Sequence, residues 1–138
     1  MELPFTGGCA CGKIRYECSA KPLEMFFCHC RDCQQAGGGG YTAGLLVAKD
    51  SLNIEGEAKY FSTPSLAGGM HTRGFCPDCG SRLFGAVKPE WNFIGIVAGS
   101  LDDPSWFKPK KHFFVADAVP WVEITDELPK FDTYQPRN

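Results

Sequence analysis

Eight cysteines in a chain of 138 residues constrain this sequence more than any other feature. Seven of them fall into three short clusters. The clusters are Cys9-Ala10-Cys11, Cys28-His29-Cys30-Arg31-Asp32-Cys33 and Cys76-Pro77-Asp78-Cys79, and Cys18 stands alone. Thiols at such short spacing are typical of a metal site, above all of zinc, which takes four protein ligands when its role is structural. The clusters therefore predict a fold organised around bound metal.

The cluster at residues 76–79, followed by Gly80, has the sequence of a zinc knuckle, a tight turn that presents two thiolates to one metal ion. Gly80 suits the close of this turn because glycine tolerates a positive φ. Cys9 and Cys11 can supply the other two ligands of a closed zinc site if they lie in an extended segment, where residues two apart face the same side. Spacing alone also permits these two cysteines to pair with the middle cluster.

Cys28, Cys30 and Cys33 form a compact set of three thiolates within one short segment. Three protein ligands and one exchangeable position are the pattern of a catalytic zinc. The seven clustered cysteines therefore predict two zinc ions per chain, one structural and one of the catalytic type.

Other uses of these residues remain open. A disulfide framework suits the even number of cysteines, but residues 1–4 carry no export signal, so we expect a cytoplasmic protein with reduced thiols. Iron also suits a site of four thiolates. His29 lies between two expected ligands and should point away from them, while His71 and His112 are alternative fourth ligands or satisfied histidines elsewhere. Cys18 is expected to be a small buried apolar side chain.

Dense turn signals, with 16 Gly and 10 Pro, separate short segments rich in β-branched and aromatic residues. The segments predicted as strands are residues 13–18, 41–48, 58–62, 82–87, 93–98 and 111–115. One helical turn is predicted at residues 31–36. We expect an all-β fold, a zinc-bearing β-sandwich or open barrel of short strands with zinc knuckles, formed by residues 1–138 as a single domain. Phe107, Trp121 and Phe131 are expected in its core rather than along a pocket.

Four consecutive glycines at residues 37–40 follow the middle cluster. They predict either a flexible connector or a backbone that must lie close to a ligand, which glycine alone permits.

The net charge of -2 and the pI near 5.9 argue against binding to nucleic acid, which requires a basic face. The basic run at residues 108–111 is expected to be a solvated loop. The longest uncharged apolar stretch, around residues 91–101, is too short to cross a bilayer, so no membrane partner is expected.

Several segments of the sequence resemble the glutathione-dependent formaldehyde-activating enzyme family, which also includes the domain of centromere protein V. They are Gly7-Gly8-Cys9-Ala10-Cys11-Gly12-Lys13-Ile14-Arg15-Tyr16, the cluster at 28–33, Phe75-Cys76-Pro77-Asp78-Cys79-Gly80-Ser81-Arg82-Leu83-Phe84, and in the tail 98–104, 112–114, Trp121 and 126–131. The resemblance covers nearly the whole chain in order.

The resemblance implies an all-β fold with one structural and one catalytic-type zinc. The structural set that it implies is Cys9, Cys11, Cys76 and Cys79, and the second set is Cys28, Cys30 and Cys33. The family's founding activity, a carbon–sulfur lyase, joins formaldehyde to glutathione to give S-hydroxymethylglutathione. It implies a small thiol or aldehyde substrate, possibly glutathione, whose sulfur takes the open zinc position and attacks an aldehyde carbon. The alternative is a non-enzymatic scaffold module with two structural zinc ions.

Overall fold

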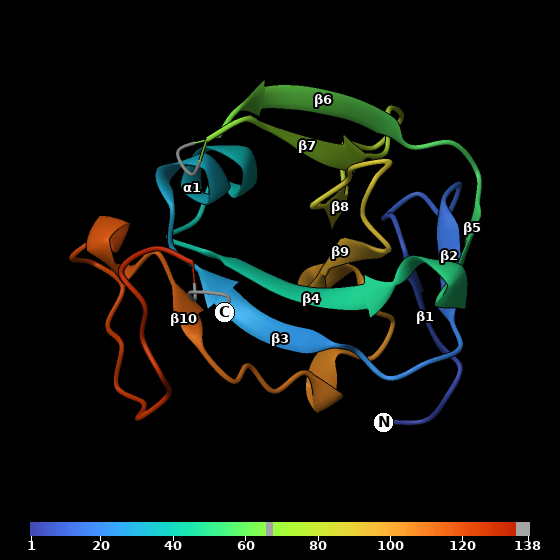
Figure 1. Cartoon of the computed structure of the whole chain (residues 1–138). Helices are drawn as coiled ribbons and strands as arrows, with labels where there is room; N and C mark the ends of the chain where they lie inside the picture. Colours follow the sequence, from blue (N-terminus) through green and yellow to red (C-terminus); the bar gives the residue numbers. More distant parts are fainter. Residues whose placement is uncertain (66–67, 135–138) are drawn as a thin grey trace.

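The computed structural model describes residues 1–65 and 68–134, which form two β-sheets and one short α-helix (Figure 1). The smaller sheet is antiparallel, with the order β1 (Phe5–Gly8), β2 (Arg15–Cys18), β5 (Leu52–Glu55). Short 3₁₀ segments lie at Lys49–Ser51, Ala98–Ser100, Pro104–Trp106 and Val115–Asp117. No helix in these two described ranges has the length and apolar character needed to cross a membrane.

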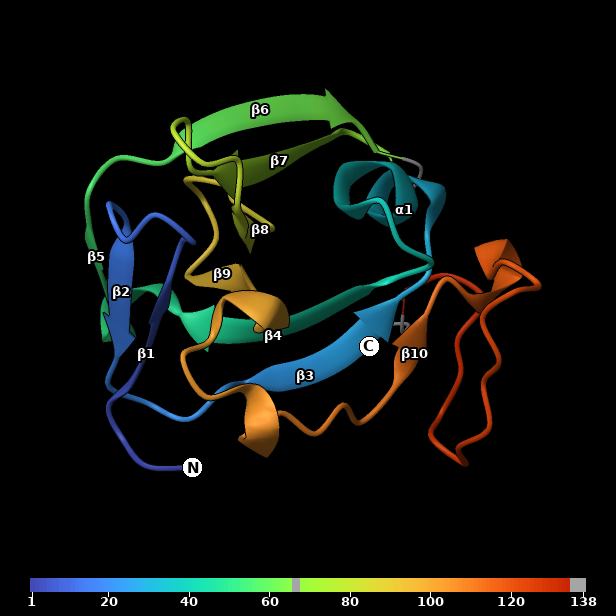
Figure 2. The same cartoon turned by 180° about the vertical axis from the view of Figure 1, so that it is seen from behind.

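The larger sheet has seven strands in the order β10-β3-β4-β9-β8-β7-β6. Their bounds are β3 (Glu24–Cys28), β4 (Thr42–Ala48), β6 (Lys59–Pro64), β7 (Met70–Phe75), β8 (Arg82–Gly85), β9 (Phe93–Val97) and β10 (His112–Phe113). All neighbours are antiparallel except β10, which runs parallel to β3. The sheet curls so that β6 and β7 lie opposite β3 and β4, with the small sheet at one side and α1 (Arg31–Gly37) at the other (Figures 1 and 2).

Alternate residues of the central strands build the main core. Leu45 and Val47 of β4 and Ile94 and Ile96 of β9 are at most 5% exposed and pack with Tyr16 of the small sheet. This burial removes apolar area from water, and it joins the two sheets into one unit. Along β4 and β9, the residues that alternate with these core residues face the opposite side of the sheet.

The prediction of a mostly β fold is confirmed, and the predicted helical turn at 31–36 is α1. The predicted strands at 41–48, 58–62 and 93–98 correspond to β4, β6 and β9 within two residues. Three predicted strands are shorter than expected. The strand predicted at 13–18 begins only at Arg15, because residues before it belong to a turn. Ala86 and Phe114 have φ of 53° and 56°, a left-handed conformation that ends β8 and β10 early.

The prediction that Trp121 is a core residue is wrong, because its side chain is 70% exposed. It lies in a turn outside both sheets. The Val122 N–H closes this turn by donating to the Val119 carbonyl at 3.1 Å. Phe107 packs against the main core, as expected. Phe131 packs against a smaller cluster of Cys28, Cys30, Phe113 and Phe114.

Candidate metal centres

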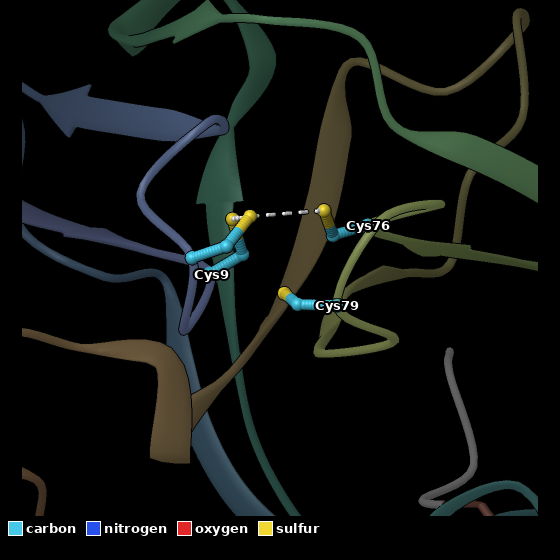
Figure 3. Close-up of side chains that lie close together, drawn as sticks. Cys9, Cys76 and Cys79 are labelled. Atoms are coloured by element: carbon cyan, nitrogen blue, oxygen red, sulfur yellow. Dashed lines mark hydrogen bonds between the residues drawn. The ribbon is translucent and has the colours of Figure 1, made fainter.

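The structure brings together the first and last cysteine clusters. Spacing alone had not determined whether the first cluster pairs with the middle one or with the last. The Sγ atoms of Cys9, Cys11, Cys76 and Cys79 all lie within 4.8 Å of one another (Figure 3). Sulfur atoms are 3.6 Å apart between Cys9 and Cys11 and 3.7 Å apart between Cys11 and Cys76. A tetrahedron with Zn–S bonds of about 2.3 Å has sulfurs about 3.8 Å apart. The four thiols, called here the tetrad, therefore fit a zinc ion.

The first arm of the tetrad is a turn, not the extended segment that we predicted. The Gly12 N–H donates to the Cys9 carbonyl at 3.1 Å, and the Cys9 N–H donates to the Ile14 carbonyl at 3.0 Å. Gly12 has a φ of 81°, which favours glycine at that position. The Ile14 N–H points at the Cys9 sulfur at 3.3 Å. The turn after β1, rather than the pleat of a strand, makes the two sulfurs converge.

The second arm is the predicted knuckle between β7 and β8. The Gly80 N–H donates to the Cys76 carbonyl at 2.8 Å, and Gly80 has the expected positive φ, 77°. The Ser81 hydroxyl lies 3.3 Å from the Cys79 sulfur and accepts from the Ala10 N–H at 3.0 Å, which links the two arms. Hydrogen bonds from the Ser81 side chain and backbone lower the pKa of Cys79 to about 5.

Cys28, Cys30 and Cys33, called here the tripod, converge where β3 ends and α1 begins. Their Sγ atoms lie within 4.8 Å of one another. Cys30 is the N-cap residue of α1, and its sulfur accepts from the Cys33 N–H at 3.3 Å, which replaces a missing bond at the helix start. Within residues 1–65 and 68–134, no further histidine, cysteine or acidic side chain joins this group.

The three tripod thiols share negative charge unevenly. Hydrogen bonds from the thiols of Cys28 and Cys30 lower the pKa of Cys33 to about 2, whereas the contacts of Cys28 with Cys30 and then with Cys33 raise the pKa of Cys28. A divalent cation removes this conflict because every ligating sulfur can then be a thiolate. The donor set therefore fits zinc with three protein ligands.

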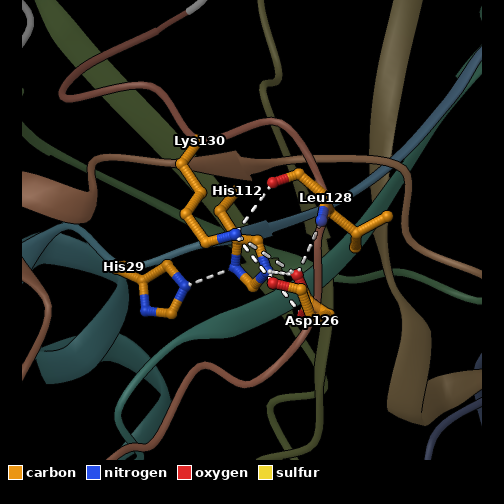
Figure 4. A network of polar contacts seen from close by, with 5 residues as sticks. All are labelled: His29, His112, Asp126, Leu128 and Lys130. Atoms are coloured by element: carbon orange, nitrogen blue, oxygen red, sulfur yellow. Dashed lines mark hydrogen bonds and ion pairs between the residues drawn. The ribbon is translucent and has the colours of Figure 1, made fainter.

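His29 points away from the tripod, as predicted, although it lies between two of its cysteines. Its Nε2 is 2.8 Å from Nδ1 of His112, and Nε2 of His112 lies 3.0 Å from the Asp126 carboxylate (Figure 4). If the Asp126 carboxylate accepts from His112, then His112 must accept from the Nε2–H of His29. His112 is thus a satisfied buried histidine and no tripod ligand. The chain of contacts ties the tripod segment to the C-terminal part of the fold.

A cavity of about 710 Å³ lies against the tripod, and Cys28 and Cys33 are among its lining residues. It occupies the face of β3, β4 and β9 that the core residues do not use. Gly44 and Gly95 line it, and a Cβ at Gly44 would lie only 3.0 Å from the Phe26 ring. Side chains at these two positions would fill part of the cavity.

His71 is the histidine that lines this cavity, although it does not join the tripod. Burial, followed by the nearby charge of Arg73, lowers the pKa of His71 below its usual value of 6.5. The imidazole is therefore neutral at pH 7 and can accept a proton.

Arginine and lysine side chains outnumber carboxylates along the cavity, which was not predicted from the sequence. Its charged residues in the described part of the chain are Glu24, Arg73, Arg82, Lys88 and Lys111. Lys111, expected in a solvated loop, is instead half-buried and pairs with Glu24 at 3.2 Å. No predicted strand included His71 or Arg73, so the alternation that places both on one face of β7 was not available from the sequence.

Two of the four glycines at residues 37–40 lie close to other protein groups. A Cβ at Gly37 would be 2.8 Å from Nη1 of Arg82, and a Cβ at Gly40 would be 2.3 Å from the Val122 side chain. Gly38 has a φ of 78° and is the left-handed C-cap of α1. At Gly37 and Gly40 the lack of a side chain serves the packing of the fold, and at Gly38 glycine suits the backbone conformation.

Cys18 belongs to neither group of thiols. It is fully buried, and its sulfur lies 3.4 Å from both the Ala20 carbonyl and the Ser51 hydroxyl. The expectation that it is a buried side chain is confirmed.

Comparison with known proteins points to one family. Residues 4–117 match the family model described as glutathione-dependent formaldehyde-activating enzyme. A Penicillium rubens protein provisionally named as such an enzyme is 26% identical over 128 residues, which are 84% of this chain and 66% of the relative. A Fusarium vanettenii protein with the same provisional name is 25% identical over 78% of this chain and 64% of its own length. The chain thus spans about two thirds of the length of these relatives.

A solved structure of a Rhodobacter sphaeroides protein shares the fold, with a TM-score of 0.55 and 17% sequence identity. The similarity covers 70% of this chain and 87% of that protein.

Proposed function

Because the chain belongs to the glutathione-dependent formaldehyde-activating enzyme family, we propose that it joins a small thiol to formaldehyde or a related aldehyde, as a carbon–sulfur lyase of that type. The observation that carries this proposal is the tripod itself. Three thiols converge beside a large cavity that Cys28 and Cys33 line, and no fourth ligand from the described residues completes the set. An open coordination position beside an accessible space is the arrangement that a catalytic zinc requires.

The tetrad has the structural role in this proposal, so the chain holds two zinc ions. Its four thiols complete a tetrahedron without any outside ligand. They also connect the turn after β1 with the β7–β8 turn, and therefore the small sheet with the large one.

In the second site, Cys28, Cys30 and Cys33 hold the metal and leave one position for the substrate thiol. A zinc ion bound there would keep an added thiol as its thiolate, which is a far better nucleophile than the thiol. The addition forms one C–S bond and one O–H bond while the S–H bond and the carbonyl π bond break. His71 is the neutral base of the cavity, and we assign to it the transfer of the proton from the sulfur to the carbonyl oxygen.

This chemistry requires reduced thiols, which fits the cytoplasmic location that we propose for the chain. The alternative is a scaffold in which a protein group closes the tripod and both zinc ions are structural. The state of the fourth position at the tripod separates the two functions.

The test uses the full chain loaded with zinc, which should contain about two metal ions by elemental analysis. Exchange between ¹³C-labelled formaldehyde and its adduct with glutathione is followed by NMR. Wild-type protein should accelerate the exchange above its spontaneous rate, and Cys33→Ser should abolish the acceleration. Cys18→Ser is the matched control and should behave as wild type. Equal rates with and without wild-type protein would reject the enzyme and leave the scaffold.

A further inference from the structure

His29 connects two cysteines of the tripod along the chain, so the way in which it is held decides how their sulfurs are placed. Its N–H donates to the Phe113 carbonyl at 2.9 Å, and its carbonyl accepts from Nε2 of Gln34 at 2.8 Å. The same Gln34 nitrogen donates to the Asp117 carbonyl at 3.0 Å. Both peptide groups of His29 are therefore bound, directly or through Gln34, to residues 113–117.

The ring of His29 is also held from the C-terminal part of the fold. The residue is 1% exposed, and its Nε2 lies 2.8 Å from Nδ1 of His112 (Figure 4). Nδ1 of His29 is buried and has no hydrogen-bond partner among residues 1–65 and 68–134. A neutral imidazole carries its proton on one of its two nitrogens. Because no described group bonds to Nδ1, the contact with His112 alone decides which nitrogen of His29 carries the proton.

Asp126 sets the direction of the hydrogen bonds in this chain of contacts. Its carboxylate lies 3.0 Å from Nε2 of His112, and that hydrogen bond lowers the pKa of Asp126, so the group is ionised at pH 7 and can only accept. A neutral His112 must then donate from Nε2 and accept at Nδ1, and His29 must donate from Nε2. Asp126 lies beyond residues 4–117, which match the family model, so the match gives it no role.

We propose that Asp126 and His112 are positioning residues for the tripod. The carboxylate sets the tautomers of both histidines, and the resulting bond to His29 holds the segment between Cys28 and Cys30 in the arrangement that receives a metal ion. A site that is ordered in advance loses less conformational freedom on binding, so it binds more tightly. The inference needs the metal site of the proposed function but not its reaction.

The first test reads the proton positions directly. The chain has three histidines, so long-range ¹H–¹⁵N spectra of the zinc-loaded full chain contain three pairs of ring nitrogens, and His71→Gln assigns one pair by its loss. At pH 8, above the ordinary imidazole pKa of about 6.5, both remaining rings should carry the proton on Nε2. Asp126→Ala should move both rings toward a mixture of tautomers. Asp126→Asn, whose amide oxygen can still accept from His112, should keep the wild-type pattern.

The second test compares the two metal sites in one spectrum. ¹¹³Cd NMR of the cadmium-loaded full chain separates a site of four sulfurs from a site of three sulfurs and one oxygen, and Cys33→Ser identifies the tripod signal by its loss. A chelator is then added stepwise. Asp126→Ala should release the tripod cadmium at about tenfold lower chelator concentration than wild type, as is typical for residues that support the ligands of a metal site. The tetrad signal should stay unchanged, which shows that the fold is intact.

Lys130→Gln is the matched control. The Lys130 ammonium donates to the Asp126 and Leu128 carbonyls at 3.0 Å and 2.9 Å, so its loss loosens the same turn and leaves the carboxylate beside His112. This variant should keep the wild-type tautomers and the wild-type affinity of the tripod. If it weakened the tripod as much as Asp126→Ala, the packing of the turn would be responsible, and the inference would be overturned.

The possible results separate this inference from the proposed function. Wild-type affinity of the tripod in Asp126→Ala overturns the inference, even if the protein accelerates the formaldehyde exchange. A tautomer change confined to one ring also overturns it, because the carboxylate would then not act through His112 on His29. A tripod that depends on Asp126 in a protein that leaves the exchange rate unchanged supports the inference and rejects the proposed function.

Discussion

The tetrad joins cysteines 65 residues apart in the chain, whereas the tripod comes from the single segment 28–33. The first connects two sheets through the turn after β1 and the β7–β8 turn. The second lies between one strand and the helix that directly follows it. A metal in the tetrad therefore closes a long loop of chain, and a metal in the tripod closes only a few residues. Loss of the two ions should have unequal effects on folding.

Exposure of the sulfurs does not follow the roles that we assign to the two sites. Cys11 and Cys79 of the tetrad are exposed at surface turns, whereas Cys28 and Cys30 of the tripod are buried and Cys33 is half-buried. The tripod nevertheless borders the cavity, while no tetrad cysteine lines it. The neighbouring space, together with the number of ligands, separates a candidate reactive site from a structural one.

The largest expected effect tests this difference. Cys76→Ser should unfold the chain or greatly destabilise it, since a structural zinc contributes about 10 kcal/mol or more to folding in small domains. Cys33→Ser should lose one zinc ion and retain the far-UV circular dichroism of the fold, at a cost of about 2 kcal/mol in the free energy of unfolding. Elemental analysis and urea denaturation measure both quantities. Equal destabilisation by the two substitutions would show that the sites do not differ in role.

A smaller effect is expected at the eighth cysteine. Cys18→Ala removes a fully buried sulfur from the main core, so the free energy of unfolding should fall by about 1–2 kcal/mol. The zinc content should stay that of wild type because Cys18 belongs to neither group of thiols. Loss of a metal ion from this variant would mean that the division of cysteines is wrong. Urea denaturation and elemental analysis again provide the measurements.

Much of both candidate sites could be predicted from sequence, because the spacing of cysteines within a turn is a local property. The Gly80 turn and the orientation of His29 follow from backbone geometry over a few residues. The strand β3 was missed because Met25, Phe26 and Phe27 form an unbroken apolar run without alternation. Whether the first cluster meets the second or the third was also undetermined by spacing, since that depends on tertiary contacts.

The arginines at the tripod could not be found in this way. A cation is usually solvated, and only the curl of the large sheet turns Arg73 and Arg82 toward an enclosed space. Trp121 is the opposite case. A large aromatic residue is usually buried, so Trp121 was predicted in the core, but its side chain is exposed. In both cases the tertiary arrangement reversed the usual preference of the residue type.

Gly37→Ala tests how the tripod end of the cavity is packed. The added Cβ would lie 2.8 Å from Nη1 of Arg82, so the flexible end of that side chain must move. The free energy of unfolding, measured by urea denaturation, should change by less than about 1 kcal/mol, because the end of a long side chain can move at little cost. Gly39→Ala is the matched control, because no atom lies within 4 Å of its added Cβ. A loss of more than about 2 kcal/mol in Gly37→Ala, with Gly39→Ala unchanged, would mean that Arg82 cannot move away from the added Cβ.

The smallest expected effect is a pH dependence on the tripod side of the fold, through His71. Burial and the charge of Arg73 lower the pKa of His71, so below its usual value of 6.5 the unfolded chain binds more protons than the folded one. The contribution of His71 to the free energy of unfolding is therefore complete above pH 6.5 and decreases as the pH falls toward the lowered pKa of the folded state.

His71→Gln removes this contribution. The difference in unfolding free energy between wild type and variant, from urea denaturation with excess zinc between about pH 5.5 and pH 8, should be constant at the upper end and change below pH 6.5. A difference that is constant over the whole range would mean that burial does not disfavour the charged imidazole. His71 would then be partly protonated at neutral pH, and it would be a poorer acceptor for the thiol proton that we assign to it.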